Sequence, residues 1–202
     1  MIEISNINKQ FFNKKIFTDF SLKIEDGEFV VFAGNSGCGK TTLLNMIGGL
    51  EKPDSGSIIV DGQDIYKRKK KEEYYLNKIG FLFQNFALIE SATIRENLEI
   101  VQKNGRSGIT VEEVLSEVGL LQDIDTEVYK LSGGEQQRVA LARLMFKKCD
   151  IILADEPTGS LDVENANMVI KFLHKLNKSG KTVILVTHDE KIIKNERRVV
   201  QL

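Results

Sequence analysis

The chain has few cysteines, little net charge of either sign and no long apolar run. Its two cysteines, Cys38 and Cys149, show no disulfide-framework spacing, which indicates a reducing compartment and argues against a disulfide-stabilised secreted domain. The formal net charge is -1, so the basic surplus of a protein whose main ligand is nucleic acid is missing. No apolar stretch approaches the roughly 18 residues that span a bilayer, and the N-terminal residues lack the apolar core of a signal peptide. We therefore expect a globular chain that acts at a membrane only through a partner.

Short apolar runs alternate along the chain with longer periodic segments. Strands are predicted for five runs rich in β-branched residues, at 29–33, 58–60, 79–83, 151–154 and 182–186. Most of these runs are apolar on both faces, as in the buried parallel sheet of an α/β protein. Apolar residues at helical spacing predict helices through 111–121 and 166–176, each with one stripe facing the core.

The middle of the chain, from about residue 86 to 148, is typical of helices and holds no strong strand candidate. We therefore expect one domain over residues 1–202, with a catalytic core of about 1–85 and 149–202 and a helical subdomain of about 86–148 inserted into it. The charged run KRKKKEEYY, at 67–75, most simply forms a solvated helix before a strand.

The stretch GNSGCGKT fits the phosphate-loop pattern G-x-x-x-x-G-K-[ST], and it lies between an apolar strand and a helical segment, as that motif requires. Its glycines let backbone N–H groups point at phosphate oxygens, and the helix start adds partial positive charge. We expect Lys40 to reach the β and γ phosphates and Thr41 to ligate Mg²⁺. The predicted nucleotide-binding residues here are Gly34, Asn35, Ser36, Gly37, Cys38, Gly39, Lys40, Thr41 and Thr42.

Two adjacent carboxylates, Asp155 and Glu156, follow the apolar run 151–154. At the end of a buried strand they would repel each other and lose hydration, so they call for a cation or a bound water. We expect Asp155 to face Mg²⁺ and Glu156 to act as general base on a water in line with the γ phosphate. The alternative is a pair that caps the following helix, although a cap would not require the preceding strand.

The stretch LSGGEQQR offers a second anion site, because Ser132, Gly133 and Gly134 place a hydroxyl and free N–H groups at a helix start. Taken alone, the same residues are equally consistent with an ordinary helix N-cap, with Glu135 in the first turn.

The order of these motifs closely resembles that of the nucleotide-binding subunits of ATP-binding cassette (ABC) transporters. The resemblance covers nearly the whole chain and includes Gln84 in FLFQN, the segment GSLD that ends at Asp162, and His188 in VTHD. It implies a P-loop NTPase fold of the α/β class, with a mostly parallel sheet core, an N-terminal antiparallel β portion and an inserted helical subdomain.

In that family two cassettes meet head to tail, and the serine and glycines of LSGGE in one cassette close over ATP held by the other. The resemblance therefore implies that Gln84 contacts Mg²⁺ and the attacking water, that His188 bonds the γ phosphate and that Asp162 bridges the two sites. His174 is expected to be ordinary helix surface. Phe11 matches the place of an adenine-stacking aromatic, but Phe12 is adjacent, and either ring could equally be core packing.

The resemblance implies an ATPase with ATP and Mg²⁺ as ligands, with an integral membrane permease and a second, identical cassette as partners, and with no nucleic acid. It places the chain at the cytoplasmic face of the membrane as a peripheral subunit. The motifs look most like cassettes of lipoprotein-release, macrolide-efflux, and bacitracin or bacteriocin export, so export or extraction of a peptide, bacteriocin, antibiotic or lipoprotein is expected. Residues 86–94 resemble the surface on which the family's permeases rest.

Other phosphoryl-transfer classes fit the sequence less well. A GTPase should show N-K-x-D, whereas the NKK at 13–15 is followed by Ile16, and a small-molecule kinase would not need LSGGE. The remaining alternative is a non-transport ATPase of the same superfamily that acts on a membrane or nucleic-acid partner.

Overall fold

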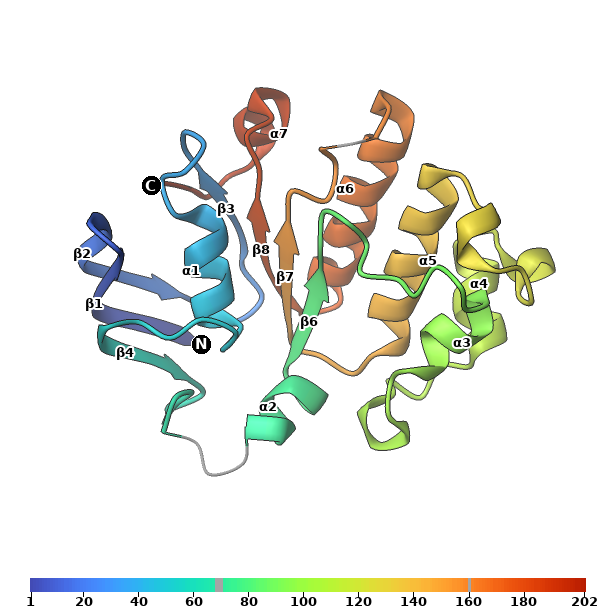
Figure 1. Cartoon of the computed structure of the whole chain (residues 1–202), viewed down its shortest axis with the longest axis horizontal. Coiled ribbons are helices and arrows are strands. Elements are labelled where there is room, and N and C mark those ends of the chain that lie inside the picture. Colours follow the sequence, from blue (N-terminus) through green and yellow to red (C-terminus); the bar gives the residue numbers. More distant parts are fainter. Residues whose placement is uncertain (68–70, 160) are drawn as a thin grey trace.

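The structure, a computed structural model, describes residues 1–67, 71–159 and 161–202 and contains two sheets (Figure 1). Sheet A is antiparallel, with the strand order β2-β1-β4-β5, and sheet B is parallel, with the order β6-β7-β8-β3-β9. The strands of sheet A are β1 (Ile2–Phe11), β2 (Lys14–Ile24), β4 (Ser55–Val60) and β5 (Gln63–Asp64). Those of sheet B are β3 (Phe29–Ala33), β6 (Ile79–Leu82), β7 (Ile151–Asp155), β8 (Thr182–Val186) and β9 (Val199–Gln201). The predicted fold class is confirmed.

Sheet B is apolar on both faces because each face is covered. In β3, Val31 belongs to a core shared with the helices of residues 94–146 and 163–178, whereas Val30 and Phe32 belong to a core shared with sheet A. Ile152 and Leu153 of β7 alternate in the same way. Successive strand side chains point to opposite faces, so a strand buried on both sides needs apolar residues throughout.

The helices surround sheet B (Figure 1). They are α1 (Lys40–Ile47), α2 (Lys71–Asn77), α3 (Ile94–Glu99), α4 (Val111–Glu117), α5 (Gly133–Phe146), α6 (Val163–Lys178) and α7 (Glu190–Asn195), with short 3₁₀ turns at Lys103–Gly105, Leu121–Asp123 and Val128–Lys130. Between residues 86 and 148, all of which are described, neither sheet has a strand, as the sequence predicts.

The predicted helix through 111–121 is wrong at its C-terminal end. Helix α4 stops at Glu117, and Gly119 follows with φ +71°, which returns the Leu120 N–H to the Leu115 carbonyl at 2.8 Å. Leu120 therefore enters the core at 1% exposure, while Leu121, the last member of the predicted stripe, is 38% exposed. The other predicted helix, 166–176, lies within α6 and is confirmed.

The charged run at 67–75 only partly forms the expected solvated helix. Helix α2 begins at Lys71, and residues 68–70 lie outside the described part of the chain. Tyr74 is 2% exposed and its hydroxyl donates to the Ile47 carbonyl at 2.7 Å. One face of α2 therefore packs on the core between α1 and sheet A.

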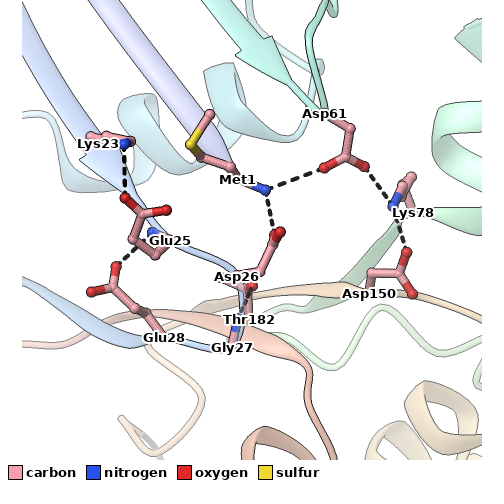
Figure 2. A network of polar contacts seen from close by, with 10 residues as sticks. All are labelled: Met1, Lys23, Glu25, Asp26, Gly27, Glu28, Asp61, Lys78, Asp150 and Thr182. Carbon is pink, nitrogen blue, oxygen red and sulfur yellow. Dashed lines mark hydrogen bonds and ion pairs between the residues drawn. The ribbon is translucent and has the colours of Figure 1, made fainter.

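A chain of charges ties the two sheets together (Figure 2). Lys78, before β6, places its Nζ 2.6 Å from Asp61 after β4 and 2.6 Å from Asp150 before β7. The Met1 amine contacts Asp26 and lies 3.2 Å from Asp61. Burial alone would raise the pKa of Asp61, but hydrogen bonds from Lys78 and the Met1 amine outweigh it and lower that pKa.

Candidate functional site

The phosphate-loop sequence joins β3 to α1 and wraps around its own lysine. Lys40 is 7% exposed, and its Nζ donates to the carbonyls of Gly34 at 2.9 Å and Asn35 at 3.0 Å. Gly39 has φ +109°, and a Cβ there would overlap Ile16 and Phe17 of β2. Glycine is thus required at this position both for its backbone angle and for the close approach of β2.

The loop opens onto a hollow of about 300 Å³. Its lining consists of Ile16, Ser36, Gly37, Gly39, Lys40, Thr41, Thr42 and Glu156. Six predicted loop residues and the predicted base, which lies more than a hundred positions away in the sequence, therefore share one cavity. Gly34, Asn35 and Cys38 belong to the same loop but not to this lining. A Cβ on Gly34 would lie 2.8 Å from Cys38 Sγ and 2.7 Å from the Leu202 carbonyl oxygen.

Two of the three predicted Mg²⁺ ligands, Thr41 and Asp155, are adjacent. Thr41 Oγ1 donates to Asp155 Oδ1 at 3.0 Å, which joins the start of α1 to the end of β7. Burial raises the pKa of Asp155, the charge of Glu156 raises it further, and the Thr41 hydrogen bond and Lys40 oppose the shift. A half-buried carboxylate beside a hydroxyl is a hard oxygen donor set in a position that favours a cation, so these residues fit Mg²⁺.

Glu156 follows β7 with φ +45°, an uncommon angle for a side chain other than glycine. Its Oε2 lies 2.6 Å from His188 Nδ1, just beyond β8. Glu156 Oε2 and Gln84 Nε2 lie 3.6 and 3.4 Å from the point that a Cβ on Gly159 would occupy. Three predicted catalytic residues therefore meet at the carboxyl end of sheet B. Because the N-cap of α6 is Asp162, the alternative reading of Asp155 and Glu156 as its caps is wrong.

Ser132 is the N-cap of α5, and with Glu135 it forms a full capping box. Glu135 Oε2 accepts hydrogen bonds from Ser132 N at 2.8 Å and Oγ at 2.6 Å. A Cβ on Gly133 would meet nothing within 4 Å, whereas one on Gly134 would lie 3.0 Å from Asn165 Nδ2 of α6. The N-cap interpretation is thus correct, and it leaves the start of α5 open for a further contact.

The start of α5 does not join the site around Lys40. In Figure 1, α1 and α5 lie on opposite sides of sheet B, and they belong to the separate cores on its two faces. Asp162 is exposed as the N-cap of α6, where its Oδ1 accepts from the Asn165 N–H at 2.9 Å; this hydrogen bond lowers the pKa of Asp162. Ser160, in the GSLD segment, is outside the described residues.

Neither candidate for the adenine-stacking ring is packed in the core. Phe12 is 99% exposed, and Phe11 is 40% exposed with Lys9 Nζ 4.7 Å from its ring centroid. Lys14, the partner of Phe11 in the β1–β2 register, donates to the Gly37 carbonyl at 3.1 Å. The end of this hairpin therefore touches the phosphate loop, with one face of the Phe11 ring covered by a cation.

Three residues make contacts that the sequence analysis did not assign. His174, expected to be plain helix surface, stacks on Phe29 with ring centroids 4.3 Å apart and lies 2.8 Å from Glu196. Asn97 is fully buried and bonds both Ile89 N and Ile89 O, at 2.8 and 3.0 Å. The sequence held a signal for this role, because Asn97 lies between Ile94 and Leu98 on a core-facing helix surface. An amide buried at such a position needs hydrogen-bond partners. Arg143 binds the carbonyls of residues 86 and 87.

Residues 86–94, which were compared with a permease-contacting surface, include partly exposed apolar side chains. Ile89 is 50% exposed, while Phe86 and Leu88 pack partly on the core. Within residues 1–67, 71–159 and 161–202, the helices all lack the length and apolarity needed to traverse a bilayer.

Comparisons with known proteins place these features in a family. Residues 17–159 match the family model described as ABC transporter. The macrolide export ATP-binding/permease protein MacB of Campylobacter jejuni subsp. jejuni is 40% identical over 209 residues, which cover all of this chain and 33% of that protein. MacB of Neisseria meningitidis serogroup A is 38% identical over 213 residues, again 33% of its length. The chain thus spans about a third of the length of these curated relatives.

Solved structures of similar length agree with the fold. The dimeric post-hydrolysis structure of the ATP-binding cassette MJ0796 bound to ADP and Pi has a TM-score of 0.85 and 34% identity, and covers 100% of this chain and 94% of that one. The dimeric structure of MJ0796 described as a bacterial ABC transporter cassette has a TM-score of 0.88 and 36% identity at the same coverage. The chain therefore belongs to the ABC transporter family, as one of its ATP-binding and ATP-hydrolysing cassettes.

Proposed function

We propose that the chain powers a transporter through ATP-driven, head-to-tail dimerisation, and that it does so as a peripheral subunit at the cytoplasmic face of the membrane. The observation that supports this proposal most strongly is the separation of the chain's two proposed anion-binding elements. The phosphate loop, Thr41, Asp155, Glu156 and His188 gather at one place, whereas the open start of α5 lies across the molecule (Figure 1). A second copy, turned head to tail, would bring its α5 to the first copy's nucleotide.

Within the site each residue has a proposed task. Lys40, freed from the loop carbonyls that it now bonds, would pair with the β and γ phosphates. Thr41, Asp155 and Gln84 would hold Mg²⁺, which when bound would neutralise charge on the phosphates. Glu156 would accept a proton from the attacking water, and Gln84, close to the same carboxylate, would orient that water.

His188 and the adenine platform complete the site. His188 contacts Glu156 through Nδ1, so Nε2 is the nitrogen that can face a γ phosphate. Phe11, whose ring is held from one side by Lys9, is the better platform for adenine, because Phe12 has no comparable support among the described residues. Asp162, exposed beside α6, would bridge the two sites of the dimer.

The transport partner is a permease that is not part of the 202 residues. The MacB relatives are named for both an ATP-binding and a permease part, and this chain aligns with about a third of the length of each relative. We infer that residues 86–148 form the helical subdomain and that partly exposed residues such as Ile89 in its first loop face the permease. The proposed task is export or extraction of a peptide, bacteriocin, antibiotic or lipoprotein.

Mixing two inactive variants tests the composite site. Lys40→Ala removes the phosphate-binding ammonium. Gly133→Asp adds a carboxylate to the start of α5, where an added Cβ meets nothing within 4 Å. Each variant alone should be nearly inactive, but a mixed head-to-tail dimer contains one site with both elements intact. Random pairing should restore roughly a quarter of the wild-type ATPase rate, because half of the dimers are mixed. A mixture as inactive as its components would contradict the proposal.

A further inference from the structure

Arg143 holds the loop that carries Gln84. It lies in the last turns of α5, and its guanidinium donates from Nη1 to the Ala87 carbonyl at 2.6 Å and from Nη2 to the Phe86 carbonyl at 2.7 Å. A guanidinium presents N–H groups in a rigid planar fork, so it can bind two neighbouring carbonyls at once, which a lysine ammonium does less well. Burial lowers the pKa of Arg143 without removing its charge.

The loop that Arg143 binds has an unusual backbone. Phe86 and Ala87 have φ values of +60° and +48°, and two consecutive side chains in this region are costly unless the surroundings impose the turn. Among the described residues, the backbone hydrogen bonds that close the turn are local, from Phe86 N to Phe83 O at 3.0 Å and from Ala87 N to Asn85 O at 2.6 Å. The hydrogen bonds from Arg143 of α5 therefore give this turn a long-range stabilisation that the local hydrogen bonds do not.

This turn decides where Gln84 lies. Gln84 is exposed, between the end of β6 at Leu82 and the turn at Phe86 and Ala87. Its Nε2 and Glu156 Oε2 approach the same point beside Gly159. A change in the turn would move Gln84 away from Glu156 without touching the phosphate loop.

We propose that Arg143 is a positioning residue for Gln84, so that α5, the helix capped by Ser132, also determines the place of Gln84 beside Glu156. This inference rests on the proposed function, in which Gln84 contacts Mg²⁺ and the attacking water. Arg143 touches neither nucleotide nor water in this scheme and acts only through the turn.

The main test compares Arg143→Lys with Arg106→Lys. Arg106 is a matched control, because it also donates to two backbone carbonyls, those of Val101 at 2.9 Å and Glu99 at 3.4 Å, in a loop with no proposed site residue. Arg143→Lys should lower kcat for ATP hydrolysis about tenfold or more with KM within about twofold, because a small misplacement of a catalytic group can cost about 10²-fold. Arg106→Lys should change neither constant.

A second readout does not depend on turnover. Amide hydrogen exchange without nucleotide should accelerate at residues 84–89 in Arg143→Lys and at residues 99–106 in Arg106→Lys. In a Gln84→Ala background, Arg143→Lys should cause no further loss of kcat, since both changes remove the same contact. An unchanged kcat, a proportionate rise in KM, or a full additional loss in the Gln84→Ala background would each overturn the inference.

Variants of Ala87 test the same turn from the loop side and serve if Arg143→Lys does not fold. Ala87→Val, a β-branched residue at φ +48°, should reproduce the loss of kcat. Ala87→Gly, which adopts that angle readily, should restore part of kcat to Arg143→Lys. A Val variant with wild-type kcat, or no rescue by Gly, contradicts the inference. An active Glu156→Gln variant would instead contradict the proposed function, which separates the two failures.

Discussion

His188 Nδ1 lies 2.6 Å from Glu156 Oε2, so the residue proposed to deprotonate water and the residue proposed to bind the γ phosphate are in direct contact. The pair joins the ends of β7 and β8, two adjacent parallel strands, and Asp155 and Val186 are directly opposite each other in that register. The position of one side chain thus depends on the other, which shapes what a substitution at either residue should do.

Replacing Glu156 with glutamine should preserve this contact and remove the base. We expect ATP hydrolysis to fall by about 10²-fold or more, the usual contribution of a general base, while ATP binding is retained. Dimers should therefore accumulate with ATP. Phosphate release and size-exclusion chromatography with ATP measure the two effects. Glu190→Gln, at an exposed residue of α7, is the control; an unchanged rate in Glu156→Gln would show that another group is the base.

Ser132 has two separable tasks, capping α5 and contacting a partner's nucleotide. Ser132→Ala should lose about 1 kcal/mol of unfolding free energy together with dimerisation, whereas Ser132→Asn, also a good N-cap, should keep stability and lose ATP-dependent dimers. Both variants should bind ATP normally as monomers. Urea unfolding and sedimentation with ATP distinguish the tasks. If Ser132→Asn dimerises like the wild type, the hydroxyl has no role across the dimer.

The Asp155 side chain should lower the unfolding free energy of the nucleotide-free chain. Because its pKa is raised on folding, the ionised form is disfavoured, and the penalty grows as pH rises from the unfolded value of about 4 through the folded pKa. Asp155→Asn should therefore raise the unfolding free energy at pH 7 by up to about 1 kcal/mol, discounted for partial exposure, and the gain should vanish below about pH 4. Hydrolysis with Mg²⁺-ATP should be lost. A less stable Asp155→Asn variant at pH 7 would refute this account.

Asp61 should show the opposite pH dependence. Its pKa is lowered by Lys78 and the Met1 amine, so its contribution is present above about pH 4 and is lost as pH falls through the folded pKa. Asp61→Asn should lower the unfolding free energy by up to about 1 kcal/mol at pH 7, since the Asp61–Lys78 pair is partly exposed. The loss should become progressively smaller toward pH 3. Denaturant unfolding across this range tests it against Asp123→Asn, an exposed control. Parallel pH curves for Asp61→Asn and the wild type would exclude the linkage.

Local patterns in the sequence predicted much of the fold. The strand at 182–186 was found with its observed bounds because all five side chains are buried, so an apolar run marks it completely. The phosphate loop was also predictable, since its function requires contiguous residues and its flanking strand and helix are adjacent in the sequence.

One error had a local cause. Leu121 was misassigned because α4 ends at Glu117 and the turn at Gly119 shifts the core position to Leu120. Features that depend on distant contacts were not predictable from local patterns. The contact of Arg143 with Phe86 and Ala87 spans more than fifty residues, and nothing local marks two positive φ angles at a phenylalanine and an alanine. The preference for Phe11 over Phe12 in our proposal rests on Lys9, whose Nζ lies 2.5 Å from Glu51 in another part of the chain.

The grip of Lys40 on the carbonyls of Gly34 and Asn35 bears on how the cassette could cycle repeatedly. Without nucleotide, the Lys40 ammonium donates to carbonyl oxygens of the loop itself and so preserves the curvature of the loop. When the hydrolysis products leave, Lys40 would exchange its phosphate contacts for these carbonyl contacts, and the loop would not have to refold. The rate of ATP rebinding should therefore be limited by diffusion and by separation of the two protomers, and hardly at all by reordering of this loop.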